Sequence, residues 1–213
     1  KLIQLSLSGI ANGAIYALVA LGFVLIFKSS DVINFAQGEL LMIGAYLTYM
    51  TVQQFGLFWP IGVVVAVILA AVVGVLIQQL VLRPLIGEPA ISVIMVTIGI
   101  AMRAVADDQQ AALSMGISIK RVWAVAWAIA AVTAAAGGIL LMSIFGGVSG
   151  TIAHVGLLVF PVVILGGLDS IPGAVVGGVI IGLLEAFAGG YLPPELGMGQ
   201  VTPFIVLVLI LLV

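Results

Sequence analysis

Residues 5–27 read LSLSGIANGAIYALVALGFVLIF, and this apolar stretch determines the fold class. A membrane hydrocarbon core about 30 Å thick requires about 20 predominantly apolar residues in a helix. Only small or weakly polar residues such as Ser8 and Asn12 interrupt the run. It is too long and too uniform for the apolar region of a signal peptide, and no small-residue cleavage site follows it. We therefore expect a transmembrane helix that ends at the polar residues 28–31.

The composition of the whole chain is that of a membrane protein. Of its 213 residues, 64% are hydrophobic and 7% are charged, whereas about 45–50% and about 25% are usual in soluble domains. With 6 basic residues and a net charge of −2, the chain cannot build the basic face that a nucleic-acid partner requires. The 27 glycines favour closely packed helices, and no run alternates as barrel strands do. The sequence predicts an all-α fold, a polytopic transmembrane helical bundle.

Further apolar segments indicate additional spans. Residues 157–167 are apolar, but Pro161 interrupts them and two glycines close them, so we expect a broken or re-entrant segment there. The other predicted spans cover residues 32–52, 57–82, 122–145, 174–188 and 202–213.

The positions of the basic residues conflict with a simple count of membrane crossings. Two predicted spans separate Lys28 from Arg83, so both lie on one face, which the positive-inside rule makes cytoplasmic. Residues 91–102 are apolar, but a helix of that length measures about 18 Å and is too short to cross. If they did cross, the basic residues of the segment 103–121 would lie outside the cell. Either residues 91–102 do not cross, or a stretch is missing near residues 100–103. We favour the second, and then expect six to eight spans.

Three passages of the sequence resemble a known family. They are SGIANGAIYAL at 8–18 with VINFAQGE at 32–39, MRAVADD at 102–108, and LGGLDSIPGAVVGG at 165–178. In this order and spacing they resemble the permease subunits of the branched-chain amino-acid ABC importers, over nearly the whole chain. Members of that family continue after residues 96–100 with the rest of a span, an external loop and a further span. Those parts are absent here, at the place where the charges indicate a missing stretch.

The resemblance implies a function and a set of partners. Residues 1–213 would form a single transmembrane permease domain, one half of a pathway for branched-chain amino acids or related small amino acids and amides. The implied partners are a second homologous permease subunit, two cytoplasmic ATPase subunits, an extracytoplasmic solute-binding protein, and the lipid bilayer of a bacterial inner membrane. Urea and short amides are also carried by related systems, and the sequence does not decide among these substrates.

The segment 103–121 is the most polar of the chain, and its pattern predicts a short helix that ends at Gly116. A solvated loop is one interpretation. The resemblance implies instead a cytoplasmic coupling helix that docks in a groove of the ATPase subunit. Such docking uses apolar positions for the groove and charged positions for its rim. The residues expected to couple are Arg103, Val105, Asp107, Asp108, Ala111, Ala112, Leu113 and Gly116.

Polar residues inside the predicted spans are candidates for the pathway. Asn34, Gln37 and Glu39 lie in the first turns of the second span, where they could cap the helix. They could instead face a water-filled pathway, because polar groups at bilayer depth must face protein or water. We name these three as the pathway candidates. Glu185 allows the same choice, and for it we favour a place near the membrane surface.

The remaining motifs point to structure rather than to chemistry. Four glycines at helical spacing, Gly173, Gly177, Gly178 and Gly182, are expected to pack helices closely. His154 is the only histidine and cysteine is absent, so we expect no metal site and no cofactor. The chain lacks a phosphate-binding glycine loop and a Ser-His-Asp set, so it is not expected to be an enzyme on its own.

The alternative function is a self-contained membrane channel or secondary transporter for a small polar solute, which would have no use for a docking helix.

Overall fold

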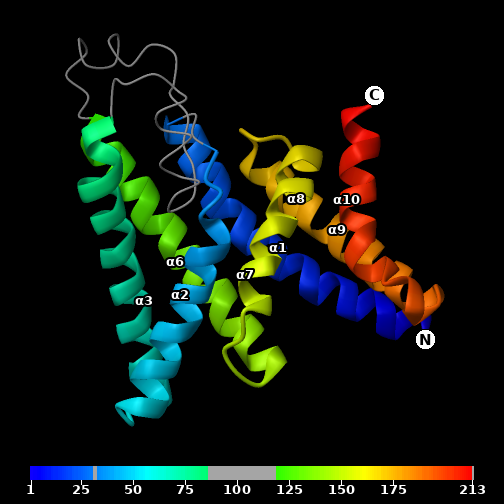
Figure 1. Cartoon of the computed structure of the whole chain (residues 1–213), viewed down its shortest axis with the longest axis horizontal. Coiled ribbons are helices and arrows are strands. Elements are labelled where there is room, and N and C mark those ends of the chain that lie inside the picture. Colours follow the sequence, from blue (N-terminus) through cyan, green and yellow to red (C-terminus); the bar gives the residue numbers. More distant parts are fainter. Residues whose placement is uncertain (31–32, 86–118, 213) are drawn as a thin grey trace.

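A computed structural model describes residues 1–30, 33–85 and 119–212 of the chain. This part consists of helices joined by short turns and contains no strand, which confirms the predicted all-α membrane fold. The π-helical segments η1 and η2 continue α2 and α3 directly. In chain order (Figure 1), the elements are α1 (Leu2–Ser30), α2 (Gln37–Tyr49), η1 (Met50–Gln54), α3 (Trp59–Ile77), η2 (Gln78–Leu82), η3 (Arg83–Leu85), α6 (Ile119–Phe145), α7 (Thr151–Val155), η4 (Gly156–Leu158), α8 (Val159–Gly166), α9 (Ile171–Tyr191), η5 (Pro194–Leu196) and α10 (Met198–Leu211).

Four helices in the described part are long and apolar enough to cross a membrane. They are Leu2–Ser30, Trp59–Leu82, Arg121–Phe145 and Ile171–Tyr191. Two shorter apolar helical stretches, Thr151–Gly166 and Met198–Leu211, accompany them. Five of these six stretches cover predicted spans closely, whereas Thr151–Gly166 begins six residues before the predicted segment 157–167. The predicted span 32–52 is not among the six, and α2 with η1 lies there instead.

Several element boundaries differ from the prediction. Helices α9 and α10 begin at Ile171 and Met198, rather than at residues 174 and 202. The second span was expected from residue 32, but α2 begins at Gln37, because the side chain of Asn34 accepts a hydrogen bond from the Ala36 N–H at 3.0 Å and forms a turn first. The segment 157–167 was expected to be broken around Pro161, but the helical run Thr151–Gly166 passes through this position, with the 3-10 turn η4 joining α7 to α8. Pro161 lies in the first turn of α8, where its missing N–H leaves no helical bond unmade.

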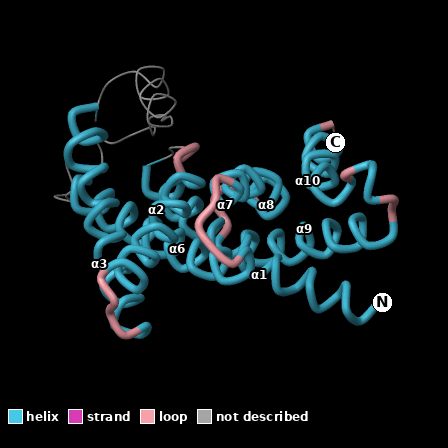
Figure 2. The backbone as a smooth tube through the Cα atoms, turned by 60° about the horizontal axis from the view of Figure 1, so that its bottom comes forward, coloured by secondary structure: helices cyan, strands magenta, loops and turns pink. Residues whose placement is uncertain are grey.

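Helix α1 runs through the middle of the bundle. It packs against α6 on one side and against α9 on the other, and Figure 2 shows it between the group of α2, α3 and α6 and the group of α8, α9 and α10. Large buried side chains fill the space beside it, among them Phe23 and Ile26 of α1, Leu41 of α2 and Trp127 of α6.

The pair of α1 and α9 is held at backbone distance by glycines. Gly13 and Gly178 face each other, and a Cβ atom added at Gly178 would lie 2.7 Å from the carbonyl oxygen of Gly13 and 2.7 Å from the backbone nitrogen of Ala17. Gly9 and Gly182 approach in the same way one turn along the helices. We call these four glycines the α1–α9 seam. The other two predicted packing glycines, Gly173 and Gly177, face the backbone of α8 at Gly166 and Val162.

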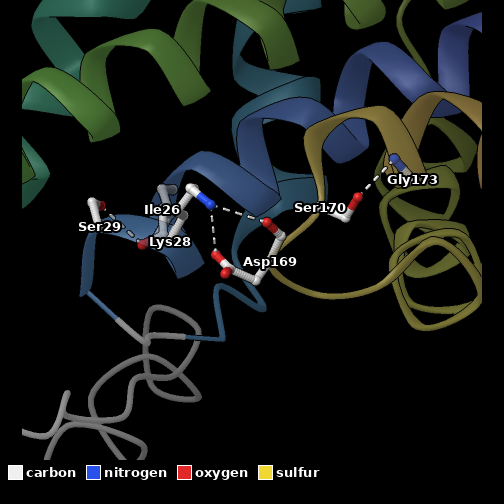
Figure 3. A network of polar contacts seen from close by, with 6 residues as sticks. All are labelled: Ile26, Lys28, Ser29, Asp169, Ser170 and Gly173. Atoms are coloured by element: carbon white, nitrogen blue, oxygen red, sulfur yellow. Dashed lines mark hydrogen bonds and ion pairs between the residues drawn. The ribbon is translucent and has the colours of Figure 1, made fainter.

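One face of the bundle gathers the ends of several helices. Lys28, near the end of α1, donates to the backbone oxygen and to Oδ1 of Asp169 in the α8–α9 loop, both at 3.2 Å (Figure 3). The chain also leaves η3 and enters α6 at this face (Figure 1). We call it the Lys28 face. The junction near residues 100–103 and the coupling segment up to residue 118 lie outside the described residues.

Candidate functional site

A cavity of about 480 Å³ lies between α1, α6, α7, α9 and α10. Its lining includes the C-terminal end of α6 and the N-terminal part of α10, so it occupies the half of the bundle away from the Lys28 face. Most of its wall is apolar, and six residues bring polar groups to it. The apolar residues are Leu141, Ile144, Phe145, Val155, Leu157, Leu158 and Phe204, and the polar ones are Asn12, Tyr16, Thr151, His154, Glu185 and Gln200.

Tyr16 and Glu185 form the central polar contact of this cavity. The Tyr16 hydroxyl donates to Oε2 of Glu185 at 2.5 Å. Tyr16 is 5% exposed, and Glu185 is half-buried. Glu185 lies six residues before the end of α9 at Tyr191, which is about 9 Å along the helix axis. The sequence interpretation favoured a place near the membrane surface, and this stays a prediction. The carboxylate lies more than one helical turn before the end of α9.

The α1–α9 seam explains how these two side chains meet. Tyr16 follows Gly13 by three residues, and Glu185 follows Gly182 by three residues. Residues three apart share a helix face, so both side chains project from the stripes that carry the seam. Because the glycines bring the two backbones together, a tyrosine on one helix can reach a carboxylate on the other.

A second, smaller cavity of about 180 Å³ lies beside the first. Glu39 and Phe35 border it on the α2 side, and His154 and Leu157 belong to the walls of both cavities. Glu39 is exposed. Of the three predicted pathway residues, it is the one that faces a cavity in the described part of the chain.

Asn34 and Gln37 lie in a closed polar cluster instead. Both are buried, at 0% and 1% exposure. The Asn34 amide donates to Gln37 Oε1 at 2.9 Å, and Gln37 Nε2 donates to the backbone oxygen of Val19 in α1 at 3.1 Å. These bonds connect the start of α2 to the middle of α1. A role of the two residues in the pathway remains a prediction.

His154 makes only a local contact among the described residues. Its Nδ1 lies 3.1 Å from the backbone oxygen of Gly150. A hydrogen bond between these atoms requires the proton on Nδ1, because a carbonyl can only accept. Within the described ranges, no group of three or more His, Cys, Asp or Glu residues could hold a metal ion.

The chain matches one protein family over nearly its whole length. Residues 5–98 and 96–212 match the family described as branched-chain amino acid transport system / permease component. The chain belongs to this family. It is a membrane permease, and the resemblance of its three motifs to such permeases is confirmed.

Curated relatives agree with this assignment. The chain is 26% identical to the high-affinity branched-chain amino acid transport system permease protein LivH of Escherichia coli, over 99% of this chain and 93% of that protein. It is 25% identical to BraD of Pseudomonas aeruginosa, a permease protein of the same description, with the same coverage. A probable LivH of Methanocaldococcus jannaschii is 25% identical over 85% of this chain and 79% of that protein. No solved structure matches the chain.

The alignments also show where the family members and this chain differ in length. The alignment with the E. coli protein covers 288 positions, more than the 213 residues of the chain. That relative therefore has residues without a counterpart here. The family match is divided at residues 96–98.

Sequence reasoning found part of this site. Glu185 drew attention as an acidic residue within an apolar run. Asn12 and Tyr16 belong to a motif that carried the family resemblance, but a single polar residue in a span does not reveal which helix it will face. The glycine spacing was the usable signal, because a residue three positions from a packing glycine lies beside the helix contact.

Proposed function

We propose that the chain is a permease subunit of an ATP-driven importer and forms half of a pathway for branched-chain amino acids or related small amino acids and amides. The observation that carries this proposal is the family match, which covers nearly the whole chain. The cavity that holds Glu185 is a suitable part of such a pathway, because it combines an apolar wall with a few polar groups within the membrane-spanning helices.

The proposed complex contains several further chains. A second homologous permease completes the pathway, two cytoplasmic ATPase subunits hydrolyse ATP, and an extracytoplasmic binding protein delivers the solute. We place the complex in a bacterial inner membrane with the Lys28 face toward the cytoplasm, since that face also carries Arg83 and Arg121. The cavity then lies in the outer half of the bundle, on the side from which the solute arrives.

The segment 103–121 is the proposed contact with the ATPase subunit. Inserting its charged residues into lipid would cost about 2.5–3.5 kcal/mol for each charge, so a position outside the bilayer is favoured. Because α3 ends and α6 begins at the Lys28 face, the segment is connected to the bundle on the proposed cytoplasmic side. ATP binding can act on the pathway only through an element that contacts the ATPase differently in its two states.

We further propose that a stretch of the family fold is missing near residues 100–103. The division of the family match at residues 96–98 supports this, as does the length of the alignments with relatives. Intact mass spectrometry of the protein purified from its native host tests the proposal. A mass several kilodaltons above the 21.8 kDa of this sequence is expected. A native mass that equals that of the printed sequence would contradict it.

The proposed function predicts transport that depends on both ATP and the binding protein. The complex is purified with its partner subunits and reconstituted into proteoliposomes, and uptake of radiolabelled leucine is measured. We expect uptake only when ATP is inside and the loaded binding protein is outside. Equal uptake without ATP would favour the alternative, a self-contained channel or secondary transporter.

A further inference from the structure

The carboxylate of Glu185 has no cationic partner in the described part of the chain. It is the single acidic residue in the four helices long enough to cross a membrane. The ion pair found among the described residues joins Lys28 to Asp169, at the other end of α9. Tyr16 bonds Oε2 of Glu185, and no described residue donates to Oε1. A carboxylate within a span is costly unless a cation or hydrogen-bond donors compensate it.

The surroundings of Glu185 are those of a small-molecule site. The cavity volume of about 480 Å³ lies within the range of about 300–1,000 Å³ that is usual for ligand pockets. Leucine, isoleucine and phenylalanine side chains of α6 and α10 form an apolar wall, and Asn12, Thr151 and Gln200 bring hydrogen-bond donors to the same space. A ligand that fits has one cationic group, one group that accepts hydrogen bonds, and an aliphatic part.

We propose that this cavity is a binding site for a zwitterionic α-amino acid, in which Glu185 pairs with the ammonium group of the ligand. Asn12, Thr151 and Gln200 supply donors for its carboxylate, and the apolar wall holds its aliphatic side chain. Tyr16 is a positioning residue, because its hydrogen bond fixes one carboxylate oxygen and leaves the other for the ligand. The inference rests on the proposed function, since the bound amino acid is the transported solute.

The site selects among the substrates that the sequence leaves open. Hydrogen bonds between two charged groups are about twice as strong as those between neutral groups. An ammonium group offsets the charge of Glu185, whereas urea and simple amides carry no charge and leave the carboxylate uncompensated. Amino acids are therefore favoured over urea and amides.

The first test replaces Glu185 by its neutral isostere in the reconstituted complex. Glu185→Gln is expected to lower leucine uptake about tenfold or more, while ATP hydrolysis stimulated by the loaded binding protein continues. The matched control is Glu195→Gln in η5, an exposed acidic residue that does not line the cavity, and it should transport like the wild type. Wild-type uptake by an assembled Glu185→Gln complex would overturn the site and leave the proposed function intact.

The second test uses the unmodified complex, so that it does not depend on the folding of a variant. A hydrophobic carbodiimide labels carboxyl groups within the membrane, and mass spectrometry measures the label on Glu185. Leucine should reduce this labelling several-fold, whereas 4-methylpentanamide, which lacks the amine, should not. Equal protection by both compounds, or by neither, would overturn the site. If the complex protects Glu185 with leucine but shows no ATP-dependent uptake, the proposed function fails and the amine site stands.

Discussion

The two ends of α9 differ in what lies beside them. At the N-terminal end, Gly173 meets the backbone of α8 at Gly166, and Asp169 just before the helix pairs with Lys28 of α1. Toward the C-terminal end, Glu185 faces a cavity of about 480 Å³, and its hydrogen-bond partner among the described residues is Tyr16 of α1. Helix α9 is thus closely packed at its N-terminal end, which we call the tight end, and against α1 at Gly182. On the side of Glu185 it borders the cavity, and we call this half the open end.

This difference shows how one apolar helix can provide both stability and a site. Where small residues allow backbone contact, the helices gain dispersion energy and exclude water and lipid. Beside Glu185 and Tyr16, space remains that a solute can enter. In the proposed orientation, the tight end lies toward the ATPase subunits and the open end toward the binding protein, and we propose that transport opens the tight end.

The largest effect is expected from changes that stop the tight end from responding to ATP. In the coupling segment, Asp107→Lys combined with Ala111→Trp reverses a charge and adds bulk at the proposed contact with the ATPase. Leucine uptake by the reconstituted complex should fall close to background, while the ATPase subunits continue to hydrolyse ATP. Uptake at the wild-type rate in this double variant would show that the segment is not the coupling element.

The next largest effect concerns the α1–α9 seam, which lies between the two ends. Gly178→Leu puts a side chain against Gly13 and Ala17, whose backbone atoms lie 2.7 Å from the first added carbon, and the two helices must separate. The yield of folded, assembled complex in size-exclusion chromatography should fall severely. Gly147→Leu, at a glycine with nothing within 4 Å, is the matched control. If both variants assemble equally well, the seam does not hold the helices together.

A moderate effect is expected from the closed polar cluster of Asn34 and Gln37. Gln37→Leu leaves the side-chain N–H of Asn34 without its partner and removes the second bond to the Val19 carbonyl, which keeps its helical bond within α1; an unpaired buried donor costs about 1–3 kcal/mol. The melting temperature of the complex should fall, whereas the exposed Gln54→Leu should change it little. A variant with an unchanged melting temperature but reduced uptake would favour the pathway role of Gln37 over the structural one.

The smallest effect is expected at the ion pair between Lys28 and Asp169. Both side chains are more than half exposed, and exposed pairs contribute about 0–1 kcal/mol. Asp169→Asn should therefore change the melting temperature slightly, and the difference from the wild type should shrink as salt screens the pair. A large loss of stability that persists at high salt would mean that Asp169 contributes through something other than this pair.

The sequence predicted the helices more fully than the site, and particular residues show why. Long apolar runs can bury their backbone in lipid only as helices, so α1, α3, α6 and α9 were foreseeable from their composition. The helical run through Pro161 was not, because Pro161 is tolerated in the first turn of α8. Asn34 and Gln37 are three residues apart and satisfy each other locally, which their spacing permits. The contact of Tyr16 with Glu185 joins residues 169 positions apart, and only the packing of α1 on α9 creates it.

Site-specific labelling tests the central claim, that the cavity at the open end of α9 is part of a pathway reached from outside. The chain has no cysteine, so single cysteines can be introduced without further changes. Thr151→Cys lies on the cavity wall, and Ala174→Cys lies at the tight end, at a position with 0% exposure. In the assembled complex without ATP, we predict that a membrane-impermeant thiol reagent added outside modifies Thr151→Cys and spares Ala174→Cys, and that leucine slows the reaction. Modification of Thr151→Cys only from the cytoplasmic side, or at a rate that leucine does not change, would contradict the account.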